Sequence, residues 1–274
     1  MRQHENAGAR VGRGTSECGG LEREGRHRGA LAGRRGVLCA GAALLLDPCL
    51  WIGADGRAET GFAPFYPPVL RPEEVPAGTA VLYTHSDEDH LGRRTAQALA
   101  GAAFYGPAPC ARALSEIGRE AERVIRPGEK FAVGCIEIEA IPADHGWQSM
   151  DVKKYGAPFG PEDCVGYILR TPHAKLLFPG DTRLMPQHRA LPDDFDAMAF
   201  DVSADPWHMG ARDGAELARH LSRAKLLPCP FGTYDAPEAV PHNGSLILAR
   251  EALGDAAARL ASDAIGAPVI FGAE

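Results

Sequence analysis

The sequence predicts a layered α/β fold, formed by one domain with an N-terminal appendage. Its 274 residues, 45% of them hydrophobic, are enough to bury one large core or two small ones. From residue 37 onward, short apolar runs alternate with helical patterns, which is typical of layered α/β architecture. Four ionisable side chains stand where expected strands end, and loops at strand ends are where such folds assemble sites. These four residues are His85, His145, Asp181 and Asp201.

Each expected element follows from its local pattern. The clearest is the run from Cys135 to Ile141, where apolar residues alternate with glutamates, as in a half-exposed strand. Strands are predicted over residues 37–46, 80–84, 131–141, 164–169, 175–178, 198–202 and 224–227. Helices are predicted over residues 91–99, 213–221 and 245–261.

The first of these strands has an alternative interpretation. Arg34 and Arg35 precede a short apolar run, as the charged start of an export signal would. The run lies deep in the chain, however, and it ends on Asp47 and Pro48 in place of a small-residue cleavage site. A buried strand is therefore the favoured interpretation.

Residues 1–36 form the appendage. They contain eight arginines, four glutamates and few apolar residues, so the segment cannot bury enough surface to order itself. It is either a disordered extension or the product of a misplaced start codon. The predicted domain then spans residues 37–274.

Composition narrows the classes of partner. The net charge is −7, and the body of the chain has no basic cluster with interleaved aromatics, which disfavours nucleic-acid binding. No run of eighteen apolar residues exists, so no membrane span is expected. Seven scattered cysteines without a C-x-x-C pair argue against a disulfide framework and favour a reducing cytoplasm. We expect a small-molecule substrate, and the oligomeric state stays open.

The segment from His85 to His90 contains a cluster of candidate metal ligands. The candidate metal ligands among its six side chains are His85, Asp87, Asp89 and His90. The segment lies at an expected strand-to-helix turn, where such ligands come close together. The alternative is a solvated acidic loop in which Asp89 caps the following helix. His145 and Asp181, at the ends of later strands, favour the metal.

In order and rough spacing, these residues resemble the metallo-β-lactamase superfamily of hydrolases. Residues 84–91 resemble its T-H-x-H-x-D-H signature, with Asp87 in place of the second histidine. Residues 44–48 match the strand before it, 142–145 the next ligand block and 179–182 the bridging-aspartate block. The resemblance covers roughly residues 37–262, most of the chain. It is nearest to the branch of ascorbate-6-phosphate lactonase, and it implies an αββα four-layer sandwich.

The resemblance also implies a ligand set for one or two divalent metals. His85, Asp87 and His145 would hold the first ion, Asp89 and His90 the second, and Asp181 would bridge both. Asp89 would also orient the attacking hydroxide, as its catalytic role. Zinc or manganese is expected and iron is an option, since the carboxylate of Asp87 makes the first site harder than three imidazoles would.

One position departs from the family pattern more seriously. The block that usually carries the last histidine reads Pro228-Cys229-Pro230-Phe231-Gly232 here, and proline cannot bind a metal. His208 and His242 are the available substitutes, both in expected loops. Alternatively, the second metal is weak or absent.

Function follows from this constellation as a hypothesis. We expect a hydrolase that uses metal-bound hydroxide on a small anionic ester, lactone or phosphodiester. Arg183 is a candidate to grip the anionic group and is otherwise a surface cation. Trp147 and Trp207 are candidate apolar walls, or ordinary packing residues. The alternative function is a catalytically silent metal-binding or regulatory member of the same fold that lacks a complete second site.

Overall fold

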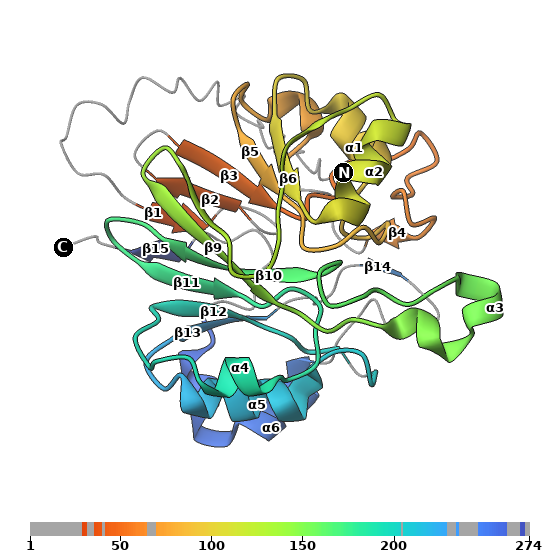
Figure 1. Cartoon of the computed structure of the whole chain (residues 1–274). Helices are drawn as coiled ribbons and strands as arrows, with labels where there is room; N and C mark the ends of the chain where they lie inside the picture. Colours follow the sequence, from red (N-terminus) through yellow and green to blue (C-terminus); the bar gives the residue numbers. More distant parts are fainter. Residues whose placement is uncertain are drawn as a thin grey trace, which may run out of the picture.

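The chain folds into two β-sheets that pack face to face, with helices on both outer faces (Figure 1). The computed structural model describes residues 29–31, 36–39, 42–64, 70–203, 205–228, 234–235, 246–261 and 269–271. Among these residues, the first sheet has seven strands, in the order β15 (Val269–Phe271), β1 (Gly29–Leu31), β2 (Gly36–Cys39), β3 (Ala42–Leu46), β5 (Ala80–Leu82), β6 (Ala103–Gly106) and β7 (Ala121–Val124). The second sheet has six, in the order β13 (Lys225–Pro228), β12 (Ala197–Phe200), β11 (Lys175–Phe178), β10 (Val165–Arg170), β9 (Ile136–Pro142) and β8 (Lys130–Val133). A small ribbon pairs β14 (Tyr234–Asp235) with β4 (Ala63–Pro64).

The helices complete a four-layer αββα sandwich, which confirms the predicted fold class. The seven-stranded sheet is covered by α1 (Arg93–Ala98) and α2 (Ala108–Glu116), and the six-stranded sheet by α4 (Pro186–Arg189), α5 (Gly210–His220) and α6 (Leu246–Leu253) (Figure 1). The short α3 (Val152–Tyr155) stands away from the body of the sandwich. The described residues also form the 3-10 helices η3 (Pro72–Glu74), η4 (Trp147–Met150) and η5 (Gly254–Arg259). No helix in these stretches is long and apolar enough to cross a lipid bilayer.

Strand direction brings the ligand-bearing loops together. In the first sheet β3, β5, β6 and β7 are mutually parallel. In the second sheet β10 is antiparallel to both β9 and β11, and β11 is parallel to β12. The carboxyl ends of β9, β11 and β12 therefore meet at one edge of their sheet, beside the end of β5. Side chains that follow these strands converge there.

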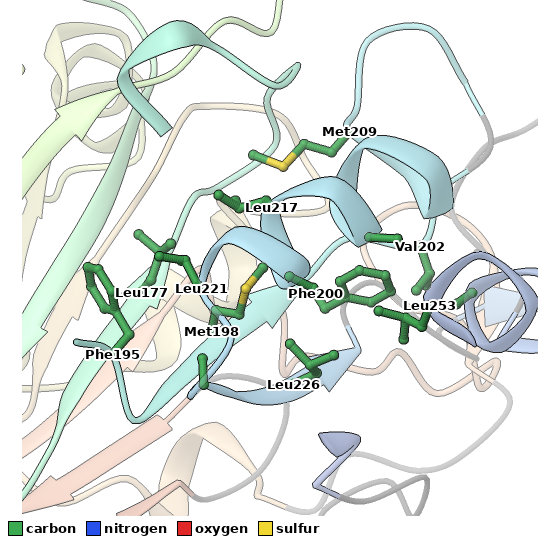
Figure 2. Close-up of a cluster of buried hydrophobic side chains, with 14 of the residues drawn as sticks. Leu177, Phe195, Met198, Phe200, Val202, Met209, Leu217, Leu221, Leu226 and Leu253 are labelled. Atoms are coloured by element: carbon green, nitrogen blue, oxygen red, sulfur yellow. The ribbon is translucent and has the colours of Figure 1, made fainter. Parts of the chain in front are cut away.

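Three apolar layers hold the sandwich. Between the sheets, buried residues of the first sheet such as Leu46 and Leu82 pack with Tyr167 and Phe178 of the second. A second cluster lies between the six-stranded sheet and α5, where Phe200 and its neighbours face Leu217 and Leu221 (Figure 2). A third cluster packs α1 and α2 against β5 and β6. Each fully buried side chain of this kind contributes roughly 1.5–3 kcal/mol relative to exposure.

Some sequence predictions of elements were wrong in detail. Residues 37–46 form two antiparallel strands, β2 and β3, with Cys39 opposite Ala42, and not one strand. Residues 131–141 likewise divide into β8 and β9, because Gly134 takes the left-handed conformation (φ 55°) that a tight turn between them needs. The closing helix ends at Leu253 and continues as η5. Strand β6, helix α2 and strand β7 had no sequence prediction.

The N-terminal boundary is described only in part. Strand β1 lies within residues 1–36, the predicted extension, and pairs with both β15 and β2. Residues 1–28 and 32–35 lie outside the described residues, so the nature of the extension stays a prediction. Where the structure describes them, Cys110 and Cys164 are buried free thiols.

Candidate metal centre

The turn after β5 delivers the first candidate ligands. His85 is fully buried, and its Nδ1 lies 2.9 Å from Oγ1 of Thr84. That hydroxyl donates its only proton to Oδ2 of Asp47, at 2.8 Å, so it must accept from Nδ1–H of His85. The Nε2 lone pair of His85 is thereby presented to the site. This pattern, in which one ring nitrogen is fixed by a hydrogen bond so that the other can bind, is usual for metal-binding histidines.

Asp47 organises this turn, and sequence analysis did not single it out as a site residue. It is the one described non-glycine residue with positive φ, at 45°, directly after β3. Its carboxylate accepts the backbone N–H of Thr84 at 2.7 Å and lies 3.0 Å from Nδ1 of His90. It therefore orients His90 as well as His85. The signal available in the sequence was an Asp-Pro pair closing an apolar strand.

Asp87 faces the buried imidazoles. Its Oδ2 lies 3.3 Å from Nε2 of His85 and 3.4 Å from Nε2 of His145. The indole Nε1–H of Trp147 donates to the same oxygen at 2.7 Å. Burial alone would raise the pKa of Asp87, but His85 and His145 outweigh it and hold that pKa well below its usual range. Asp87 is therefore a carboxylate ion that points into the site.

Asp181 joins the two halves of the centre. Its Oδ2 lies 2.9 Å from Nε2 of His90, on the first sheet's side, and 2.9 Å from Nε2 of His208, on the second's. Despite burial, these two imidazoles hold the pKa of Asp181 well below its usual range. Gly180 lets the loop that carries Asp181 pass close to the start of β10. A Cβ at position 180 would lie 2.9 Å from the carbonyl oxygen of Val165.

His208, one of the two substitutes considered from the sequence, lies in this site beside Asp181. Its Nδ1 lies 2.5 Å from Oδ2 of Asp205, which leaves Nε2 directed at Asp181. Burial would lower its pKa, but the carboxylates of Asp181 and Asp205 raise the pKa of His208 to about 11. The site therefore attracts positive charge at this point strongly. A divalent cation would compete with that proton for the same place.

The candidate ligands form three overlapping groups in which every pair of ligand atoms lies within 4.8 Å. The groups are His85–Asp87–His145, His85–His90–Asp181 and His145–Asp181–His208. The first contains the three residues that the resemblance assigns to the first ion. The other two share Asp181, the expected bridge, and add His208.

These residues fit a divalent metal. Nε2 of His85 is buried and has no hydrogen-bond partner within the part of the chain that the structure describes. A buried acceptor without a partner is costly unless something else, such as an ion, satisfies it. Imidazole nitrogens and carboxylate oxygens are the donors that Zn²⁺, Mn²⁺ and Fe²⁺ take in proteins.

The remaining sequence candidates lie around this centre. Asp89 is outside the three groups, and its Oδ2 is 3.7 Å from Nε2 of His90. Arg183 is paired with Asp144. Its Nε and Nη2 donate to Oδ2 of that carboxylate at 3.1 and 2.7 Å. The guanidinium also lies over the ring of Trp207, 5.6 Å from its centroid. His242 lies outside the described residues.

Asp201 has a structural role. Its carboxylate accepts from the backbone N–H of Ser203 at 2.8 Å and of Met209 at 3.0 Å, where α5 begins. Burial raises the pKa of Asp201. Asp201 thus holds the start of α5, directly after His208, and is not in any of the three groups of ligands.

Two cavities lie near the turn. A small one of about 20 Å³, room for about one water molecule, is lined by Asp47, Thr84 and Asp181 among others. A larger one of about 610 Å³ lies on the other side of the turn, where Glu88 is the only lining residue from the segment 85–90. None of the grouped ligands lines the larger cavity, so its size does not locate the chemistry.

Comparison with known proteins identifies the family. The model of the β-lactamase superfamily domain matches residues 43–229, which include every candidate ligand except His242. The chain belongs to the β-lactamase superfamily. No curated protein matches it.

Solved structures of other proteins share the fold at low identity. An isothiocyanate hydrolase from Delia radicum gut bacteria is 18% identical, with a TM-score of 0.69, and the match covers 90% of this chain and 100% of that one. A possible metal-dependent hydrolase from Veillonella parvula is 16% identical, with a TM-score of 0.63 and coverage of 89% and 98%. A metallo hydrolase from the archaeon Ignicoccus hospitalis is 15% identical, with a TM-score of 0.59 and coverage of 90% and 99%. These likenesses concern the fold.

Proposed function

We propose that this superfamily member is a metal-dependent hydrolase of small anionic esters, lactones or phosphodiesters. The observation that carries the proposal is the position of Asp181, whose Oδ2 lies 2.9 Å from imidazole nitrogens on both sides of the site. A bridging carboxylate between two ligand groups supports a centre for two divalent ions, with Zn²⁺ or Mn²⁺ first and Fe²⁺ as an option. Such ions, when bound, polarise a carbonyl or phosphoryl oxygen and lower the pKa of water.

The chain's own residues prepare the site for that chemistry. Thr84 and Asp47 fix the imidazoles of His85 and His90, and Asp205 fixes His208, so that each Nε2 faces inward. Asp89, whose Oδ2 lies 3.7 Å from Nε2 of His90, would hold and orient the attacking water. These side chains are ordered when the chain folds, so the entropy lost in ordering them does not add to the activation free energy of the reaction.

The rim favours an anionic substrate. Arg183 is about half exposed, with 48% of its side chain accessible, and its orientation is set by Asp144 and the ring of Trp207. A planar guanidinium held in this way suits a carboxylate or phosphate group. The resemblance of the ligand blocks to the ascorbate-6-phosphate lactonase branch supports lactones among the candidate substrates.

The alternative, a silent member without a complete second site, was suggested by Pro230. The position of His208 supports the complete site, because His208 joins a group with His145 and Asp181. An active hydrolase is therefore the function that the geometry supports best.

The test is metal counting joined to a substrate panel. The full chain is stripped with a chelator, reconstituted with Zn²⁺, Mn²⁺ or Fe²⁺, and assayed on anionic esters, lactones and phosphodiesters beside neutral analogues. We expect bound metal, turnover that depends on it, and a preference for the anionic member of each pair. Protein that takes up none of the three metals would overturn the proposal. Metal uptake without turnover on any substrate would favour the silent alternative.

A further inference from the structure

We propose that Trp147 is a positioning residue that makes the carboxylate of Asp87 act as a one-atom ligand, as the histidine it replaces would. Asp87 occupies the second-histidine position of the signature, where an imidazole would offer a single nitrogen. A carboxylate has two oxygens, so it can bind through either oxygen or through both. Something must select one if the site is to keep its geometry.

The indole selects that oxygen. Nε1–H of Trp147 donates to Oδ2 of Asp87 at 2.7 Å, a short distance for a hydrogen bond to a carboxylate. The same Oδ2 lies 3.3 Å from Nε2 of His85 and 3.4 Å from Nε2 of His145. The hydrogen bond therefore fixes the oxygen that faces the other ligands. It also occupies one lone pair of that oxygen and leaves the remaining lone pair directed into the site.

Trp147 is held in place by its own segment. It begins η4, two residues after His145, and Ser149 closes the turn by donating to the carbonyl of Gly146 at 2.7 Å. Its ring packs against that of Tyr155 in α3, with centroids 4.8 Å apart. Because the turn follows a ligand directly, the position of the indole is tied to that of His145.

The end of the segment returns to the site. The ring of Phe159 meets His85 edge-on, with centroids 5.9 Å apart, and its backbone N–H donates to Oε1 of buried Gln148 at 3.3 Å. Residues 146–160 thus contact the ligands at both ends, through Trp147 and Phe159. A segment anchored twice can hold the indole N–H at a fixed distance from Asp87.

Trp207 provides the contrast. It also adjoins a site histidine, yet its buried Nε1 has no hydrogen-bond partner among the residues that the structure describes. Its backbone carbonyl, and not its indole N–H, lies near His145, 3.3 Å from Nδ1. Replacement of each tryptophan by phenylalanine removes one N–H and keeps an aromatic ring, so the two variants form a matched pair.

The inference rests on the proposed metal centre, and the test separates the two. Mn²⁺ and Zn²⁺ affinities of the full chain are measured by chelator competition, without reference to turnover. We expect Trp147→Phe to weaken the tighter site about 10-fold, as loss of a hydrogen bond to a ligand usually does, and Trp207→Phe to leave it unchanged. Native protein that binds neither metal would overturn the proposed function together with this inference. Native protein that binds metal, with Trp147→Phe binding equally well, would overturn this inference alone.

A second background tells positioning from general support of the fold. In Asp87→His, position 87 offers a single nitrogen and has no carboxylate to restrain. We expect adding Trp147→Phe to that variant to cause no further loss of metal affinity. An equal 10-fold loss in both backgrounds would show that the tryptophan only supports the fold. Thermal unfolding of the metal-free proteins checks that the native chain, the two single variants at positions 87 and 147 and the double variant are all folded.

Discussion

The two halves of the sandwich contribute to the centre in different ways. The first sheet presents His85, Asp87 and His90 from a single turn that follows β5. The second sheet presents His145, Asp181 and His208 from three separate loops, after β9, after β11 and before α5. One half is therefore a local motif, and the other is a product of strand order.

The contacts that hold each half differ accordingly. Backbone N–H groups of His90 and Leu91 both donate to the carbonyl of Asp87, at 3.0 and 2.7 Å, and close the turn on itself. In the second half, loops distant in sequence are tied to each other, as when the N–H of Asp144 donates to Oγ1 of Thr182 at 2.8 Å. We infer that changes in the first half act locally, whereas changes in the second also alter how the halves meet.

Asp181, where the halves meet, should give the largest effect. Asp181→Asn keeps the shape but removes the charge that faces His90 and His208. We expect metal content to fall and turnover on any substrate found to drop by more than about 100-fold, beyond the 10–100-fold typical of groups that only support ligands. Metal analysis and steady-state kinetics measure this, with the exposed surface residue Asp194→Asn as control. Full activity in Asp181→Asn would contradict the bridging role.

His208 tests whether the second half supplies its own last ligand. We expect His208→Ala to lower the ratio of bound metal to protein while the group of His85, Asp87 and His145 still binds. His242→Ala, the other substitute considered from the sequence, should keep the native ratio. Metal titration of both variants decides between them. A loss confined to His242→Ala would transfer the role to that residue.

The same comparison explains how much could be predicted from sequence. The turn of the first half was readable because its ligands lie within six residues and one strand leads into them. His145 and Asp181 were readable because each closes an apolar strand. The αββα class followed from these blocks together with the resemblance.

Other parts of the centre depend on contacts that the sequence does not show. His208 does not follow a strand directly, so its sequence position does not indicate that it reaches the site. In the fold its Nε2 lies 2.9 Å from Oδ2 of Asp181. Asp47 is 37 residues from Thr84, and Trp147 is 60 residues from Asp87, so nothing local marks either hydrogen bond. Strand β6 was missed because its four residues are too few to establish a period of two.

Asp47 probes the organisation of the first half, with a smaller effect on function. Asp47→Ala leaves the N–H and hydroxyl of Thr84 without their acceptor, and we expect it to lower the free energy of unfolding by about 2–4 kcal/mol. Asp47→Asn tolerates the left-handed backbone and keeps one oxygen for Thr84, so its loss of stability should be less than half as large. Both should weaken metal binding about 10-fold or more, since neither holds His90 with a charge. Urea unfolding and chelator competition measure the two effects. Equal stability of the two variants would argue against the role in the turn.

His188 lies outside the three groups of ligands, so it should have the smallest effect on function, and it contrasts with His208, twenty residues away. It is buried in α4, where Nδ1 accepts the N–H of Met185 at 3.1 Å. Burial, assisted by the charge of Arg189, lowers the pKa of His188 to about 4, whereas two carboxylates raise that of His208 to about 11. Between pH 6.5 and 4 the unfolded chain therefore binds a proton at His188 that the folded chain does not. Stability present above pH 6.5 is lost as the pH falls through this window, by about 3 kcal/mol in full.

His188→Asn keeps an acceptor for the N–H of Met185 and cannot titrate. We therefore expect the free energy of unfolding of the metal-free variant, measured in urea, to depend less on pH between 6.5 and 4 than that of the native chain. The exposed His173→Asn should not change the dependence. If His188→Asn followed the native profile, burial of His188 would not be the source of this acid sensitivity. At His208, in the same half, the carboxylates of Asp181 and Asp205 shift the pKa in the opposite direction. We infer that the convergence of these carboxylates favours the binding of cations at that edge of the sheet.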